Sequence, residues 1–271
     1  MGVLNVTPDS FSDGGRHSSL DAAIDHALSM MDAGADLIDI GGESSRPGSD
    51  AVPLELELQR VVPVIEVLAR RGIGPISIDT TKVEVARRAL DAGAAILNDI
   101  SGGTFEPPML ELAARAKAPL VLMHLRARPK AMQEGAWRYE GGVVAAVVRA
   151  LAERIAAAES AGVDRGDIVV DPGIGFGKTT EENVELLAGL RELASLGCPI
   201  LVGTSRKSFL GQLTGRQVNR REYATAASVA LAISAGADLV RVHDVEAMGD
   251  VVRVADAIAR RSCVGAARVL S

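Results

Sequence analysis

Aromatic side chains are scarce in this sequence of 271 residues. Only 3% of the residues are aromatic, namely one tryptophan, two tyrosines and four phenylalanines. Hydrophobic residues nevertheless make up 48% of the chain, and a chain of this length buries a large core. We therefore expect a core of valine, isoleucine, leucine and alanine, with the few aromatic rings placed elsewhere.

Cysteine is also rare, since the chain has only Cys198 and Cys263. One disulfide cannot staple a fold of this size, and nothing in the sequence argues for an oxidising compartment. We expect both cysteines to be reduced and structural, and the protein to be cytoplasmic.

The sequence also lacks long apolar runs and an excess of positive charge, which argues against membrane and nucleic-acid partners. No apolar run reaches the roughly 20 residues that a membrane span requires, and no basic-then-apolar leader is present, so we expect no membrane partner. Lysine and arginine total 29 against 35 aspartates and glutamates, which gives a net charge of −6. That sign argues against a nucleic-acid partner, because phosphate backbones require positive surface. An anionic ligand must therefore be met by a local cluster of cations.

The sequence does have a regular alternation of short apolar, β-rich runs with longer helical segments, which is typical of an α/β fold with a parallel sheet. The predicted strands lie at 3–5, 37–40, 76–79, 95–98, 120–123, 168–171, 200–202 and 239–242. The predicted helices lie near 19–33, 54–71, 82–92, 108–116, 142–161, 180–195, 222–235 and 246–260.

Eight alternations without a linker predict a single (β/α)₈ TIM barrel over residues 1–261. The remaining residues, 262–271, form a C-terminal tail that we expect to fray. An open, doubly wound sheet is the competing topology. The sequence disfavours it because no dinucleotide-binding fingerprint is present.

Polar or glycine-rich residues end every predicted strand, and in such barrels the active site lies at the C-terminal mouth of the strands. This placement favours one shared binding site. Asp79, Asn98 and Asp171 follow three different strands, so they are placed to clasp a heterocycle that presents several ring N–H donors. The alternative is that these three side chains cap the helices that follow them.

A set of cations follows the second, seventh and eighth strands. It consists of Arg46, Arg206, Lys207, Arg241 and His243. In a chain of net negative charge, cations that converge at a barrel mouth indicate an anion site, and barrels commonly bind phosphate near the last two βα loops. Surface salt bridges are the alternative. The segment 173–178 looks like a phosphate loop, but Pro172 occupies the position of the first glycine, so the nucleotide interpretation fails.

The four phenylalanines all fall in predicted loops after strands. They are Phe11, Phe105, Phe176 and Phe209. We expect these rings at the mouth, where a flat ligand stacks on them. The alternative is that they close the barrel end as a hydrophobic cap.

Eight ordered motifs, covering nearly the whole chain, resemble the dihydropteroate synthase family, a family of pterin-binding TIM barrels. They lie at 1–15, 39–48, 77–80, 98–100, 123–124, 171–178, 205–209 and 241–244. The resemblance implies that the chain condenses 6-hydroxymethyl-7,8-dihydropterin diphosphate with p-aminobenzoate in folate biosynthesis. It also implies an SN1-like reaction, in which diphosphate leaves before the amine attacks.

The resemblance implies roles for individual residues as well. Pterin binding is implied for Asp79, Asn98, Ile100, Met123, Asp171 and Lys207. Diphosphate binding is implied for Asn5, Arg46, Arg241 and His243, with Asn5 also a ligand of the cofactor Mg²⁺. Binding of p-aminobenzoate is implied for Phe11, Ser45, Pro47, Phe176, Ser205 and Lys207. The catalytic residues implied are Asn5, Lys207, Arg241 and His243, in a chain expected to be a homodimer.

The chain departs from the family pattern at Ser45, Ala127 and Gly141, and two alternatives accompany the resemblance. Ser45 stands where the family usually has threonine, which keeps the hydroxyl and loses a methyl contact. A methyltransferase domain on the same barrel has a similar pterin clasp but expels no diphosphate, so the segments 205–207 and 241–243 favour the synthase. A relative that binds pterins without turnover is the second alternative, and an assay for dihydropteroate separates it from an enzyme.

Overall fold

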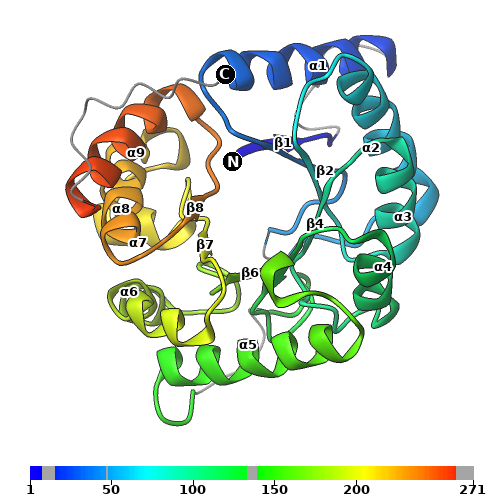
Figure 1. Cartoon of the computed structure of the whole chain (residues 1–271). Coiled ribbons are helices and arrows are strands. Elements are labelled where there is room, and N and C mark those ends of the chain that lie inside the picture. The colour runs from blue at the N-terminus through cyan, green and yellow to red at the C-terminus, as the bar shows by residue number, and fades with distance from the viewer. Residues whose placement is uncertain (8–15, 47, 133–138, 261–271) are drawn as a thin grey trace.

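The computed structural model describes residues 1–7, 16–46, 48–132 and 139–260, in which strands and helices alternate around a ring (Figure 1). The strands are β1 (Gly2–Asn5), β2 (Ile38–Gly41), β3 (Ile76–Asp79), β4 (Ile96–Asp99), β5 (Leu120–Met123), β6 (Ile168–Asp171), β7 (Leu201–Val202) and β8 (Leu239–Val240). The helices are α1 (Arg16–Asp32), α2 (Leu54–Arg70), α3 (Val83–Ala92), α4 (Pro108–Ala116), α5 (Val143–Ser160), α6 (Thr180–Ala188), α7 (Ser208–Thr214), α8 (Glu222–Ser234) and α9 (Val245–Ala259). Short 3₁₀ helices are η2 (Arg165–Asp167), η3 (Leu190–Leu196) and η4 (Val218–Arg220).

The strands close into a barrel. Strands β1 to β6 form one parallel sheet in chain order, and β7 pairs in parallel with β8. Isolated parallel bridges join the two sheets, one between Val170 and Ile200 and the other between Gly2 and Val242. The amide of Val3 donates to the carbonyl of Val242 at 3.0 Å, which ties the first strand to the end of the last. The predicted (β/α)₈ barrel is confirmed, and the open doubly wound sheet is excluded.

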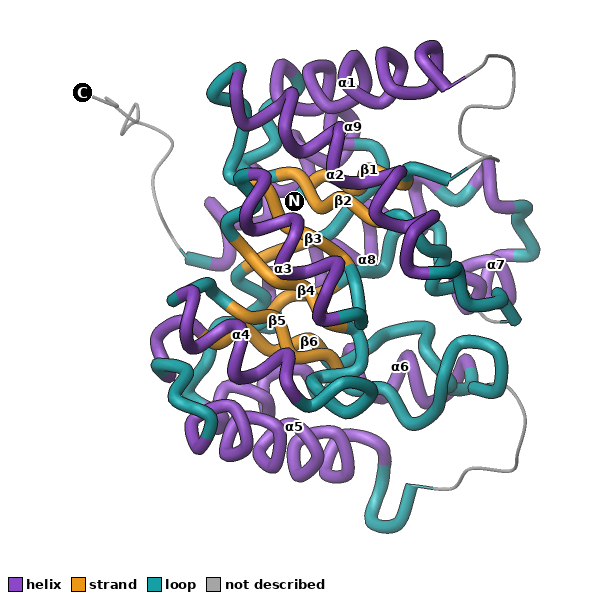
Figure 2. The backbone as a smooth tube through the Cα atoms, turned by 90° about the vertical axis from the view of Figure 1, so that its right-hand side faces the viewer, coloured by secondary structure: helices purple, strands orange, loops and turns teal. Residues whose placement is uncertain are grey.

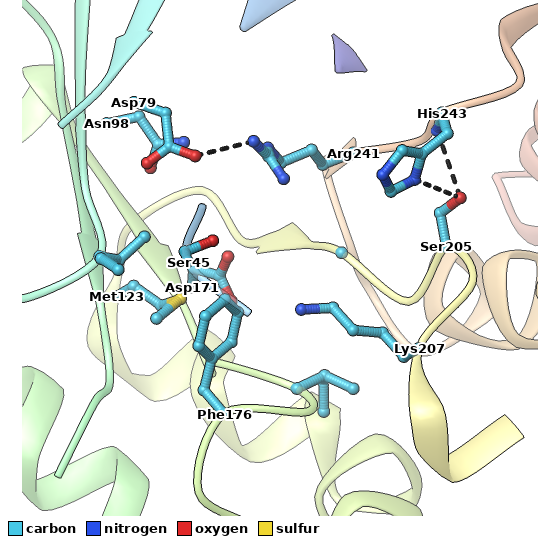
Figure 3. A pocket seen from close by; sticks show the side chains of 13 residues that line it. Ser45, Asp79, Asn98, Met123, Asp171, Phe176, Ser205, Lys207, Arg241 and His243 are labelled. Carbon is cyan, nitrogen blue, oxygen red and sulfur yellow. Dashed lines mark hydrogen bonds and ion pairs between the residues drawn. The ribbon is translucent and has the colours of Figure 1, made fainter. Parts of the chain in front are cut away.

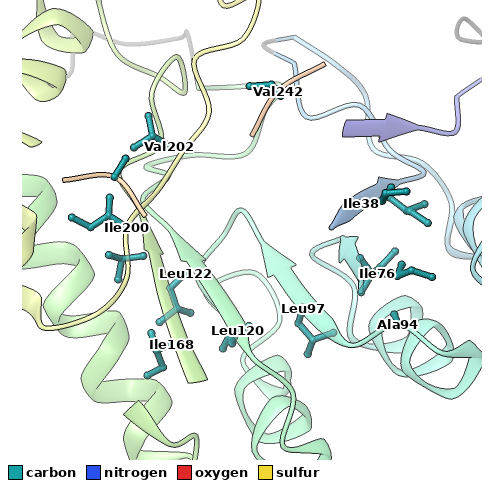
Figure 4. Packing of buried hydrophobic residues seen from close by; sticks show 14 of the residues in the cluster. Ile38, Ile76, Ala94, Leu97, Leu120, Leu122, Ile168, Ile200, Val202 and Val242 are labelled. Carbon is teal, nitrogen blue, oxygen red and sulfur yellow. The ribbon is translucent and has the colours of Figure 1, made fainter. Parts of the chain in front are cut away.

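Helices surround the strands on the outside, as a second view of the backbone shows (Figure 2). Every residue of β2 and of β5 is buried, as expected for parallel strands that are covered on both faces. Aliphatic side chains fill the space around the strands (Figure 4). Ile38, Leu120 and Ile168 have no exposed surface. The predicted aliphatic core is confirmed, since Phe209 is the one aromatic ring among the buried hydrophobic residues that the structure describes.

Two local expectations were wrong. The helix α7 was not predicted, and it places Phe209 in the core at 3% exposure instead of at the mouth. The predicted helix 180–195 is divided at Gly189 into α6 and η3. A Cβ on Gly189 would lie 2.7 Å from Cγ2 of Val144, so the chain passes too close to α5 for a larger residue there.

The expectations about the cysteines, the C-terminal tail and membrane spans can be compared only with the described residues. Cys198 is buried and free, whereas Cys263 and the predicted tail 262–271 lie outside the described residues. Within the described ranges, no helix combines the length and the hydropathy that a membrane span requires.

Candidate active site

The predicted pterin-binding residues line one pocket at the carboxyl ends of the strands (Figure 3). The lining consists of Ser45, Asp79, Asn98, Ile100, Met123, Asp171, Ile174, Phe176, Gly203, Ser205, Lys207, Arg241 and His243. Asn5 and Arg46 are outside this lining, and Phe11 and Pro47 lie outside the described residues.

Arg241 is held by two carboxylates in this pocket. Its Nε donates to Oδ2 of Asp39 at 2.7 Å, and its Nη2 donates to Oδ2 of Asp79 at 2.9 Å. Asp39 is fully buried, and the same Oδ2 accepts a hydrogen bond from Nδ2 of Asn98 at 3.0 Å. A buried carboxylate requires such partners, because an unpaired charge away from water is costly. These contacts fix the guanidinium between β2 and β3.

Sequence reasoning missed Asp39. The only signal was a carboxylate in the middle of an otherwise apolar strand, between Ile38 and Ile40. Such a residue points either to solvent or to a buried partner, and the strand pattern does not identify a partner 202 positions away. The structure also places one of the predicted cations among the carboxylates. Arg241 was expected in a cluster of cations apart from the acidic residues, but it lies between Asp39 and Asp79.

Burial dominates the electrostatics of Asp79. It raises the pKa of Asp79 to about 7, although Arg241 opposes the shift and Asp39 adds to it. Asp79 is therefore poised to exchange a proton near neutral pH, or to accept a hydrogen bond from a bound heterocycle.

Asn98 and Asp171 present the other polar edge of the pocket. Nδ2 of Asn98 donates to Asp39, which fixes the orientation of the amide, and the amide oxygen of Asn98 is the group that can accept from a ligand. Oδ1 of Asp171 accepts the amide of Gly173 at 2.7 Å. Burial raises the pKa of Asp171, and the Gly173 amide opposes that shift.

The helix-capping alternative is excluded for the two carboxylates. Helix α6 is capped by Thr179, whose side chain accepts the amide of Glu182 in a capping box. Helix α3 begins after Lys82 without a side-chain cap. Asp79 and Asp171 therefore face the pocket instead of supporting the helices that follow them.

His243 and Ser205 form a second polar pair at the edge of the pocket. The amide of His243 donates to Oγ of Ser205 at 3.2 Å, and Nδ1 of His243 lies 3.0 Å from the same oxygen. The pKa of His243 is lowered to about 3, first by burial and then by the positive charges of Arg241, Arg206, Lys207 and Arg46. Four cations acting on one imidazole indicate a strongly positive region, which suits an anion.

Lys207 and Phe176 form the wall opposite Asp79. Nζ of Lys207 lies 3.9 Å from the centroid of the Phe176 ring, a cation–π contact. Burial lowers the pKa of Lys207 to about 8, and Arg241 contributes to that shift. Lys207 therefore keeps its charge on most molecules at neutral pH.

A closed parallel barrel with buried carboxylates and converging cations at its carboxyl mouth defines the class of the protein as a TIM-barrel enzyme. A family model described as "Pterin binding enzyme" matches residues 1–243. The chain belongs to the pterin-binding enzyme family and, within it, to the dihydropteroate synthases.

Individual relatives support this membership. The dihydropteroate synthase of Synechocystis is 50% identical over 261 residues, which is 96% of this chain and 90% of the relative. A structure of the Xanthomonas albilineans enzyme with 4-aminobenzoic acid is 49% identical with a TM-score of 0.88, covering 95% of this chain and 92% of that one. The same enzyme in complex with 7,8-dihydropteroate is 47% identical with a TM-score of 0.85, at the same coverage of 95% and 92%.

Proposed function

We propose that this chain condenses 6-hydroxymethyl-7,8-dihydropterin diphosphate with p-aminobenzoate to give 7,8-dihydropteroate and diphosphate. The observation that carries the proposal is one pocket in which the carboxylates Asp79 and Asp171 lie beside the cations Lys207 and Arg241 and the imidazole of His243. Such a pocket matches a substrate with a polar heterocycle at one end and a diphosphate at the other. The product complex of the Xanthomonas albilineans relative supports the same reaction.

The pterin end is assigned to the carboxylates and the amide. Asp171 accepts from the donor-rich aminopyrimidinone edge. Asn98 offers its amide oxygen as a second acceptor, and the bond from its Nδ2 to Asp39 holds the amide in place. Met123 and Ile100 supply apolar walls for the ring. Burial of these contacts strengthens each hydrogen bond to the ring, because water does not compete for it.

The diphosphate end is assigned to the cations. Arg241 is already oriented by Asp39 and Asp79, so it stabilises charge on the leaving group without reorganising, which is the main catalytic requirement when a C–O bond ionises. His243 is neutral. Oγ of Ser205 accepts a hydrogen bond from the backbone amide of His243, so the hydroxyl hydrogen of Ser205 is available to Nδ1 of the same histidine. The imidazole proton would then lie on Nε2, which would donate to the anion.

Mg²⁺ is part of this proposal. Asn5 ends β1, and its side chain is partly exposed. No cluster of three or more His, Cys, Asp or Glu side chains suited to a metal is present among the described residues. One amide oxygen from Asn5 fits Mg²⁺, which uses few protein oxygens and completes its shell with phosphate oxygens and water. Asn5 would supply one oxygen, and the bound ion would offset charge on the departing diphosphate.

The p-aminobenzoate end is assigned to four other residues that line the same pocket, namely Ser45, Phe176, Ser205 and Lys207. An arylamine is a nucleophile near neutral pH, so no strong general base is needed. The protein's task is to orient the amine toward the pterin methylene and to exclude water from it. Phe176 offers a ring face for stacking, and Lys207 lies above that ring.

A product assay tests the proposal. The protein is incubated with the pterin diphosphate, Mg²⁺ and p-aminobenzoate, and each component is omitted in turn. We expect dihydropteroate and diphosphate in equal amounts only when all three are present. Pterin binding without product would instead support a binding protein, and would contradict the proposal.

We also propose that the enzyme is a cytoplasmic homodimer. Leu231 of α8 and Val254 and Ile258 of α9 are exposed at 69%, 60% and 74%, and the two helices pack side by side. Exposed aliphatic side chains on adjacent helices are typical of an interface between subunits. Sedimentation equilibrium of the wild type and of Leu231→Glu tests the dimer, which we expect the introduced charge to weaken.

The buried free thiol of Cys198 is in keeping with a reducing compartment, and cell fractionation tests the proposed cytoplasmic location.

A further inference from the structure

The loop between β6 and α6 is built around the buried amino group of Lys178, whose pKa is lowered to about 7 mainly by burial. Lys178 is 7% exposed, and its Nζ donates to the carbonyl of Gly173 at 2.8 Å and to the carbonyl of Phe176 at 3.3 Å. The carbonyl of Gly173 also accepts the amide of Phe176 at 3.2 Å. One lysine therefore holds both ends of the turn that carries Phe176.

A second buried side chain holds the middle of the same loop. Asn183, which is 1% exposed, accepts the amide of Gly175 at 2.6 Å through its Oδ1. Its Nδ2 donates to the carbonyls of Lys178 at 3.2 Å and Thr179 at 2.7 Å. These bonds leave the loop with little freedom, since its interior polar groups are paired with buried partners.

The loop is in direct contact with the proposed substrate pocket. Phe176 lines the pocket and lies beneath Nζ of Lys207 (Figure 3). A Cβ on Gly175 would lie 2.8 Å from Cδ of Lys207, so the backbone at Gly175 packs against the stem of that lysine. A displacement of the loop would therefore move Phe176 and Lys207 together.

We propose that Lys178 and Asn183 are positioning residues, which set the wall formed by Phe176 and Lys207 and so determine the affinity of the enzyme for the arylamine. This inference rests on the proposed function, because it assigns that wall to p-aminobenzoate. Lys178 is not among the residues that line the pocket. Its Nζ donates to two loop carbonyls and so takes the place of the water that those carbonyls would otherwise require.

The pterin subsite responds less to this loop. Asn98 and Asp39 come from other strands and are held by each other and by Arg241. Asp171 is the pterin residue that touches this loop, because its Oδ1 accepts the amide of Gly173 at 2.7 Å. Its own backbone belongs to β6 and is paired with β5, so the strand holds it in place. Removal of the Lys178 amino group is therefore expected to affect the two substrates differently. The affinity for the arylamine should fall far more than the affinity for the pterin.

The first experiment compares Lys178→Met with the wild type by steady-state kinetics. We expect the KM for p-aminobenzoate to rise roughly tenfold or more, because charge-assisted hydrogen bonds of this kind are lost. The dissociation constant of 6-hydroxymethylpterin, measured by calorimetry without the arylamine, should change less than about threefold. Lys117→Met, a change at the exposed residue that ends α4, is the matched control and should leave both constants unchanged.

The second experiment separates positioning from folding. In Lys178→Ala the deleted atoms correspond to propylammonium, so added n-propylammonium chloride should lower the KM for p-aminobenzoate toward the wild-type value. Tetramethylammonium chloride at the same ionic strength should not. If Lys178 variants do not fold, Asn183→Ala tests the same loop and should show the same split between substrates.

Three outcomes overturn the inference. They are equal weakening of both substrates in the folded variants, an unchanged KM for p-aminobenzoate, and no rescue of Lys178→Ala by propylammonium. Wild-type product formation in the same assay separates these results from a failure of the proposed function, since that failure would leave no turnover to compare.

Discussion

Arg241 and Asp79, which are 162 positions apart in the sequence, are joined by a hydrogen-bonded ion pair of 2.9 Å at the barrel mouth. The pair places a group that suits the pterin directly beside a group that suits the leaving diphosphate. The bond that breaks in the proposed reaction lies between those two parts of the substrate. Ring recognition and leaving-group stabilisation are therefore built from one connected set of side chains.

Replacing Arg241 with methionine should mainly affect turnover. The variant keeps much of the side-chain volume and loses the preorganised positive charge, so we expect kcat to fall about 100-fold or more. Binding of p-aminobenzoate that depends on diphosphate should also be lost. Steady-state product formation measures the first effect and equilibrium dialysis with added diphosphate measures the second. Unchanged kcat in a folded variant would contradict the assignment.

The raised pKa of Asp79 predicts a pH-dependent effect on stability. Its ordinary pKa of 3.8 is raised to about 7 in the folded protein, so its contribution to stability is fully present below about 4 and is lost as the pH rises through 7. Asp79→Asn removes this loss, while Arg241 keeps its bond to Asp39. The melting temperature of the variant minus that of the wild type should therefore be more positive at pH 8 than at pH 5.

Differential scanning calorimetry at the two pH values measures this difference. Asp250→Asn, at an exposed carboxylate on α9, serves as the control and should show no such trend. A difference that is the same at pH 5 and pH 8 would show that the desolvation of Asp79 is not the cause.

His243 should respond to an anion. Its pKa of about 3 reflects burial and then the surrounding cations, so the imidazole of the free protein should not titrate between pH 5 and pH 8. Bound diphosphate adds negative charge near the ring and should raise that pKa. NMR of the imidazole resonances, assigned with His243→Gln, measures both states. A normal titration near pH 6.5 in the free protein would argue against the positive region described here.

Much of the fold was predictable because local patterns determine it. Each strand is a short apolar run that ends in, or is followed at once by, a polar or glycine residue, and the eight strands occur where the sequence predicts them to within about a residue or two. Helix α7 was missed because its seven residues are too few to show a helical period. Phe209 was then misplaced in a loop.

The site was predictable only as a set of strand ends. The sequence indicates that Asp79, Asn98, Asp171 and Arg241 share a mouth, because parallel strands bring their ends together. It does not indicate that Arg241 bonds to Asp39, since no local pattern relates residues 202 positions apart. Contacts of that kind depend on barrel closure.

The buried contacts of Asp39 predict that this residue contributes to the stability of the fold. Asp39→Ala leaves Arg241 and Asn98 without a shared acceptor in a fully buried position, so we expect a loss of about 3 kcal/mol of stability. Urea denaturation measures that loss. Asp250→Ala, which breaks an exposed ion pair with Arg253, should cost less than about 1 kcal/mol. A loss at Asp39 no larger than the loss at Asp250 would disprove its structural role.

A crystal structure of the protein with a hydrolysis-resistant analogue of the pterin diphosphate and Mg²⁺ tests the central claim most directly. We predict that the ring edge will contact Asp171 and Asn98, and that the phosphates will contact Arg241 and His243. A ring or a diphosphate bound away from this pocket, or bound with its ends reversed, would contradict the account.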